Sequence, residues 1–174
     1  LFYSILPTAT QYARNALFAG MMPADIEKRF PGKWINEEEE GSKNAHEEEF
    51  LAEHLKRLGK NVKYSYHKIT NIAAGKKLAE SMNNLMGNSL NVIVYNFVDM
   101  LSHARTEMEI IRELAEDEPA YRSLTKSWFE HSPLLDMFKF IAEKGCRVVL
   151  TTDHGTIRVT EPSKVVGDRN TNTN

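Results

Sequence analysis

The sequence has few of the features that mark secreted, membrane or nucleic-acid-coating proteins. It contains one cysteine, Cys146, in 174 residues, so no disulfide can form within it. No apolar run approaches the roughly 20 residues that cross a bilayer, and no basic segment with an apolar core opens the chain. A net charge of -2 argues against a global basic field that binds nucleic acid regardless of sequence. We expect a soluble, cytoplasmic protein without membrane contact.

The two ends of the sequence both resemble interior segments of a domain. Residues 1–6 have the composition of a strand already under way, with no turn before it. Residues 169–174 are polar and lack periodicity, which is typical of a loop. We therefore expect residues 1–174 to be a single domain that is truncated at both ends.

Near-continuous apolar segments separated by helical patterns predict an α/β fold. Residues 90–98 and 147–152 are the clearest strands, and such strands are typical of a parallel sheet that is covered on both faces. We expect these two strands to be parallel in one sheet, with helices on both faces. Further expected elements are a strand at 61–66 and helices from Thr10 to Gly20, near 23–30, from an Asn44 cap to Gly59, at 72–85, and around breaks at Pro119 and Pro133.

Polar residues follow three of the expected strands, at the edge where parallel sheets bind ligands. Asp99 follows the strand at 90–98, and His103 lies four residues later, one turn along a helix. A carboxylate and an imidazole at this spacing suit zinc. The alternative is that Asp99 only caps the helix and His103 faces solvent.

Asp153-His154-Gly155 follows the expected strand at 147–152. Adjacent Asp and His side chains add nothing to a core at this point, and they can serve one metal ion or reach toward two. The alternative is an ordinary turn, because Asp and Gly are common turn residues.

Thr10 lies where the first strand turns into a helix. Its hydroxyl would lie at the positive end of the helix dipole, which favours anions such as phosphate, and a nearby metal could activate it as a nucleophile. The alternative is that Thr10, or Thr8, is only the helix N-cap.

These segments together resemble the alkaline phosphatase superfamily. Pro7-Thr8-Ala9-Thr10, with Gly20 and Pro23 behind it, is similar to the nucleophile segment of nucleotide pyrophosphatase/phosphodiesterases. Asp99-x-x-x-His103 and Asp153-His154-Gly155 resemble the metal-ligand segments of the same families, in the same chain order. In detail, residues 4–14 and 95–99 resemble PglZ domains, specifically the effector domains of response regulators linked to type IX secretion.

The resemblance implies two zinc ions and a role for each residue. Thr10 would be the nucleophile and a metal ligand, Asp153 and His154 would bind the metal on its side, and Asp99 and His103 would bind the other. Two further family ligands, an aspartate before the first residue and a histidine after Gly155, match nothing in this sequence. Phosphate contacts are expected from the following cations: Arg14, Lys164 and Arg169.

The implied activity is metal-dependent phosphodiester hydrolysis of short or cyclic-dinucleotide-like oligonucleotides, as output of a two-component system. The implied partners are an upstream receiver domain, a second copy of the chain, and a sigma factor or sensor kinase. Two alternatives remain: a phosphomonoesterase or phosphotransferase with the same metal core, and a non-catalytic binding and signalling module that keeps its metal.

Overall fold

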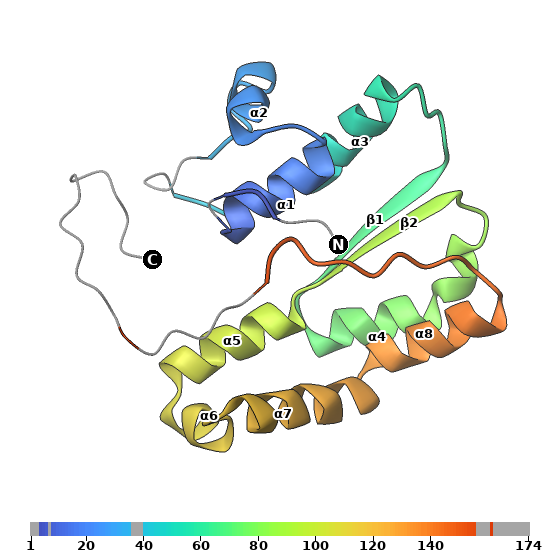
Figure 1. Ribbon diagram of the computed structural model, residues 1–174. Helices are drawn as coiled ribbons and strands as arrows, with labels where there is room; N and C mark the ends of the chain where they lie inside the picture. The colour runs from blue at the N-terminus through green and yellow to red at the C-terminus, as the bar shows by residue number, and fades with distance from the viewer. Residues whose placement is uncertain (1–3, 7, 36–39, 156–160, 162–174) are drawn as a thin grey trace. The chain divides into compact units, whose positions relative to one another are not determined.

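The computed structural model describes residues 4–6, 8–35, 40–155 and 161, and within these it leaves out the side chains at positions 99, 102, 105 and 106 (Figure 1). The chain divides into two compact units. The first comprises Leu1–Glu47 and Thr151–Asn174, and the second comprises Glu48–Leu150. The prediction that residues 1–174 form a single domain truncated at both ends stays a prediction.

The first unit contains two helices, α1 at Thr10–Ala19 and α2 at Pro23–Arg29, which pack together (Figure 1). Gly20 ends α1 in the left-handed conformation, at φ +59°, which glycine adopts without steric cost. Pro23 begins α2, where its missing N–H costs nothing. The expected helix that ends at Gly20 and the short helix after it are therefore confirmed.

The buried face of α1 is more polar than its apolar spacing predicts. Gln11 and Asn15, one turn apart, are buried, whereas Leu17 is 48% exposed. Both amides donate hydrogen bonds to main-chain carbonyls of later residues in the same unit, which offsets part of the cost of removing them from water. The Asn15 Oδ1 atom is buried without a hydrogen-bond partner among the described residues. The sequence pattern gave no signal for these bonds, because their acceptors lie 24 and 28 residues away.

The second unit is built around a small parallel sheet. Strand β1 at Tyr64–Ile69 pairs with β2 at Leu90–Tyr95, with Tyr64 opposite Leu90. Helix α3 at Glu47–Arg57 belongs to this unit except for its first residue, Glu47, which is the last residue of the first unit's N-terminal part. The other helices are α4 at Ile72–Glu80, the short η1 at Met82–Leu85, α5 at Phe97–Glu107, α6 at Glu109–Leu114, α7 at Glu118–Glu130 and α8 at Pro133–Glu143. None of the helices in the described ranges is both long and apolar enough to cross a membrane.

The core of the second unit lies where α4 and α8 pack against each other beneath the sheet (Figure 1). Ile69 from β1 and Met137 from α8 are almost fully buried there, and Ile93 and Tyr95 of β2 pack against them. Leu78, Met82 and Leu85 complete the buried set. Side chains alternate between the two faces of a strand, so every second residue of β1 and β2 points toward this core.

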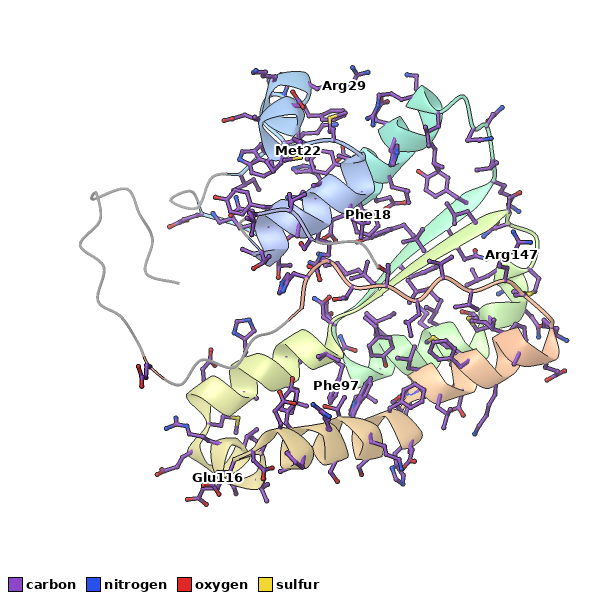
Figure 2. The ribbon with its side chains drawn as sticks, viewed as in Figure 1. Phe18, Met22, Arg29, Phe97, Glu116 and Arg147 are labelled. Carbon is purple, nitrogen blue, oxygen red and sulfur yellow. The ribbon has the colours of Figure 1, made fainter. Side chains whose placement is uncertain are left out.

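An aromatic stack joins the end of β2 to α7. The Phe97 and Trp128 rings lie parallel with centroids 3.4 Å apart, and Tyr95 meets Trp128 edge-on at 5.5 Å. Figure 2 shows Phe97 at the start of α5, beside α7. Burial raises the pKa of the Tyr95 phenol above its ordinary value, so this hydroxyl stays neutral within the core.

Several expected elements differ in the structure. Residues 147–152 form no strand, contrary to the prediction, and Val149 and Leu150 are 84% and 81% exposed. An apolar run forms a strand only if a neighbouring strand pairs with it. The sheet of the described residues has only the strands β1 and β2, and neither pairs with residues 147–152. The larger parallel sheet with helices on both faces therefore stays a prediction. Residues 4–6 are also not in a strand, and residues 1–3 lie outside the described ranges.

Smaller shifts have local causes. The expected strand at 61–66 begins instead at Tyr64. Asn44 is not the residue before α3, which begins three residues later at Glu47, and the Asn44 Nδ2 donates to the Thr10 main-chain oxygen. The region of two expected helices around Pro119 and Pro133 holds four, α5 to α8, and both prolines lie in the first turn of a helix.

Gly75 in α4 provides the first testable prediction. A Cβ at this position would lie 2.6 Å from the Tyr95 hydroxyl oxygen and 3.5 Å from Ile69. We expect Gly75→Ala to lower the free energy of unfolding by about 1–2 kcal/mol, because overpacking costs about 1–3 kcal/mol while the better helix propensity of Ala returns up to about 1 kcal/mol.

The matched background is Tyr95→Phe, which removes the hydroxyl that the new Cβ meets. Gly75→Ala should there be neutral or stabilising, and urea unfolding of the four proteins of this double-mutant cycle measures the difference. An equal loss in both backgrounds would show that the Tyr95 hydroxyl is not the source of the strain.

Candidate functional site

Thr10 is the first residue of α1, and its hydroxyl does not cap the helix. The N-cap is Ala9, whose backbone is extended, and Thr8 is exposed. The Thr10 Oγ1 atom instead lies 3.0 Å from Nε2 of His154, a residue 144 positions later. Thr10 as a mere N-cap is therefore excluded, and the hydroxyl faces an imidazole within the first unit.

The His154 ring has a defined tautomer. Its Nδ1 lies 2.9 Å from the main-chain oxygen of Gly155. A carbonyl oxygen can only accept, so Nδ1 carries the proton and donates to it. In the neutral ring Nε2 then presents its lone pair, either to accept the Thr10 hydroxyl proton or to bind a metal ion.

Asp153 brings a carboxylate to the same place. Its Oδ2 atom is buried, has no hydrogen-bond partner among the described residues, and lies 3.9 Å from Nε2 of His154. The Ser4 hydroxyl donates to the Asp153 main-chain oxygen at 2.8 Å, which ties this segment to residues near α1. A buried carboxylate oxygen without a donor is costly unless a cation binds it.

The side-chain donor atoms of these three residues are of the right type and spacing to bind one metal ion. Thr10 Oγ1, His154 Nε2 and Asp153 Oδ2 are oxygen and nitrogen donors of the kind that zinc takes. Their separations of 3.0 and 3.9 Å bracket the roughly 3.3 Å between neighbouring ligands of a tetrahedral ion with bonds of about 2.0 Å. Among the described residues, no group of three or more His, Cys, Asp or Glu side chains gathers, so the set is two such residues and a hydroxyl.

A cleft of about 580 Å³ in the first unit includes His154 and Asp153 in its lining. One part of its wall is apolar and comes from α1 and the residues just after it: Ala13, Ala16, Leu17, Met21 and Met22. The segment Thr151 to Gly155 contributes the polar part. The exposure of Leu17 is explained by this cleft, which offers an apolar surface beside the imidazole.

Asn44, which lies between α2 and α3, and Glu47, the first residue of α3, hold α1 through polar contacts. The Arg14 guanidinium forms an ion pair with Glu47, whose side chain is 1% exposed. The Asn44 amide donates to the Thr10 main-chain oxygen at 3.3 Å. Neither Glu47 nor Asn44 lies in a motif, so the sequence predicted no role for Glu47 and only a capping role for Asn44. Arg14 has a structural partner, and its expected contact with phosphate stays a prediction.

The remaining predicted residues lie elsewhere. Asp99 and His103 belong to α5 in the second unit, and His103 is exposed. The N-cap of α5 is Asn96, so Asp99 does not cap it; the Asp99 side chain lies outside the described part of the structure. Lys164 and Arg169 also lie outside the described residues. The second metal set and these two phosphate contacts stay predictions.

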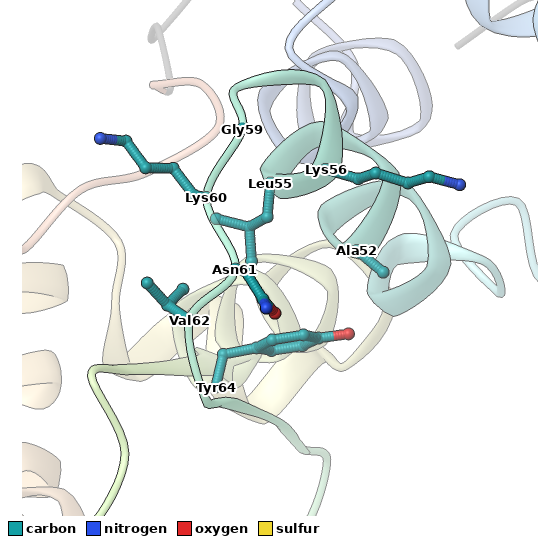
Figure 3. A pocket seen from close by; sticks show the side chains of 8 residues that line it. All are labelled: Ala52, Leu55, Lys56, Gly59, Lys60, Asn61, Val62 and Tyr64. Atoms are coloured by element: carbon teal, nitrogen blue, oxygen red, sulfur yellow. The ribbon is translucent and has the colours of Figure 1, made fainter.

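A second pocket, of about 370 Å³, lies between the end of α3 and the start of β1 (Figure 3). Its lining includes Leu55, Val62 and Tyr64, and also Lys56 and Lys60, whose side chains run outward to either side in the view. It contains none of the predicted site residues. The chemistry of the chain therefore points to the cleft of the first unit.

The chain matches a known protein family. The family model described as the BREX system PglZ alkaline phosphatase-like domain matches residues 1–174. A search of curated proteins found none that matches. Alkaline phosphatase-like domains are metal-dependent, and the match indicates a phosphoesterase-type hydrolase. Because the match spans the whole sequence, the chain belongs to the PglZ family of alkaline phosphatase-like domains.

Proposed function

We propose that this chain is a zinc-dependent phosphodiesterase that cleaves short or cyclic oligonucleotides through Thr10. The observation that carries the proposal is the Thr10 Oγ1 to His154 Nε2 distance of 3.0 Å, beside the unpartnered Oδ2 of Asp153. A hydroxyl next to an imidazole lone pair and a buried carboxylate are the parts that a metal-assisted nucleophile needs, and the imidazole and carboxylate residues line the cleft.

The reaction proposed for these residues has two steps. Thr10 Oγ1 attacks phosphorus in line and forms a new P–O bond, while the P–O bond to the leaving oxygen breaks. The Thr10 proton passes through water to that oxygen, so the leaving group departs as an alcohol and the phosphorus stays esterified to Thr10. Water then attacks this ester and releases the phosphate product with the Thr10 hydroxyl restored. Bound zinc ions would lower the pKa of the hydroxyl and stabilise the charge on both oxygens. Thr10, Asp153 and His154 would hold one ion, and Asp99 and His103 are proposed to hold the other.

The site supports a diester with an apolar or aromatic substituent. Leu17, Met21 and Met22 form an apolar wall on which a nucleobase could lie, beside the residues that face phosphorus. The position of Thr10 at the N-terminus of a ten-residue helix favours the phosphate anion. The net charge of -2 favours a short substrate over a long duplex.

The cellular role rests on sequence resemblance. The segments around Thr10 and Asp99 resemble the effector domain of the response regulator PorX, so we propose an output domain in the cytoplasm. A receiver domain upstream would control it, a second copy of the chain could pair with it, and a sigma factor or a sensor kinase would be its signalling partner.

A comparison of two aryl phosphates tests the activity. We expect the intact protein, loaded with zinc, to cleave bis(4-nitrophenyl) phosphate about 10-fold or more faster than 4-nitrophenyl phosphate, in kcat/KM, because the cleft accommodates a second substituent. A chelator should remove this turnover and zinc should restore it. A preference for the monoester would favour a phosphomonoesterase, and tight zinc binding without turnover of either compound would favour the binding module.

A further inference from the structure

The first turn of α1 is held by a residue that is remote in sequence. The Asn44 side chain, 8% exposed, donates its amide hydrogen to the main-chain oxygen of Thr10 at 3.3 Å. That oxygen has two lone pairs, so it can accept this bond as well as a helical one. We propose that Asn44 is a positioning residue that fixes the direction of the Thr10 hydroxyl, an inference that rests on the proposed role of Thr10 as nucleophile.

Other polar contacts of α1 fix the helix but not residue 10. Gln11 donates to the Ile35 oxygen at 2.7 Å, and Asn15 donates to the Lys43 oxygen at 3.0 Å. The Arg14 and Glu47 pair lies one turn after Thr10. Asn44 is distinct because its contact is with the nucleophile residue itself.

The backbone contact controls the side chain because threonine is β-branched. Two heavy atoms on Cβ restrict threonine χ1 in a helix to two main rotamers, and the bond to His154 is made in one of them, so the orientation of the Thr10 backbone limits where Oγ1 can lie. In-line attack needs the reacting atoms within about 3–3.5 Å and aligned, and a misplacement of about 1 Å can cost about 10²-fold in rate. A bond that limits the rotation of the first turn therefore acts on kcat.

Asn15 offers a matched control for Asn44. Both are buried asparagines whose Nδ2 donates to a main-chain carbonyl, and both bonds join α1 to residues 43 and 44. We expect Asn44→Ala to lower kcat for bis(4-nitrophenyl) phosphate about 10- to 100-fold, with KM changed less than about twofold. Asn15→Ala removes the same kind of N–H bond and should lower the melting temperature while leaving kcat near that of the wild type.

The outcomes separate the two proposals. Equal kcat values for Asn44→Ala and Asn15→Ala, with Thr10→Ala inactive, would overturn the positioning role alone. Turnover retained in Thr10→Ala would overturn the proposed nucleophile, whatever Asn44 does. If Asn44→Ala does not fold, Asn44→Asp keeps the size of the side chain and loses the N–H donor, and a wild-type kcat in that variant would overturn the positioning role.

Discussion

Replacing Thr10 by alanine should lower phosphodiester turnover by about 10³-fold or more and change the melting temperature by only a few degrees. Without Oγ1 the protein cannot form the covalent phosphate ester, so the loss is in kcat. The substitution removes one hydrogen bond, to His154, worth about 1 kcal/mol, and Ala is a better helix former than Thr. Turnover of bis(4-nitrophenyl) phosphate and thermal melting of the same sample measure both effects.

Thr8 supplies the control for this substitution. It is the same residue type two positions earlier and is exposed, so Thr8→Ala should keep full turnover. Thr10→Ser retains a hydroxyl and should keep part of the activity, since serine leaves χ1 freer than threonine does. Turnover that survives in Thr10→Ala, together with a lowered melting temperature, would mean that the hydroxyl only stabilises the segment around His154.

The second large effect is expected on stability, from Glu47→Ala. The substitution leaves the Arg14 guanidinium, whose side chain is 12% exposed, buried without the Glu47 carboxylate. Breaking a buried ion pair from one side costs about 3–5 kcal/mol, and urea unfolding should show a loss of this size. Replacing both residues by Met should recover much of the stability, because no charge is then left buried.

The exposed pair of Arg122 and Glu118 is the control for the buried one. It joins the same residue types on α7, at 2.9 Å, with side chains 77% and 47% exposed. Glu118→Ala should cost at most about 1 kcal/mol, because water screens both charges. Equal losses of stability in Glu47→Ala and Glu118→Ala would show that burial does not determine how much the Arg14 and Glu47 pair contributes to the free energy of unfolding.

Helix ends and strands that depend on nearby residues were predicted from the sequence. Gly20 ends α1 as expected, and the apolar run at 90–98 contains β2. The grouping of Thr10 with Asp153 and His154 was also predicted, although from resemblance to a family and not from spacing. The structure does bring these three residues together.

The rest depended on partners that no local pattern identifies. Residues 148–150 are as apolar as a strand, yet no described segment pairs with them. Asn44 is a residue type that is common at helix N-termini, but its amide donates to the Thr10 carbonyl oxygen, 34 residues away. Buried polar residues such as Glu47 cannot be told from surface ones until their partners are known.

The order of the segments along the chain determines when the site can assemble during synthesis. The first unit is discontinuous, since the whole second unit is inserted between its two parts, and the hydrogen bond from Thr10 to His154 joins residues 144 positions apart. At a translation rate of about 5–20 residues per second, His154 is added roughly 7–30 s after Thr10. The second unit has no such gap and can fold as its own segment emerges. The nascent chain therefore carries Thr10 without its histidine until the inserted unit has been made, and the Thr10 and His154 contact can form only after that.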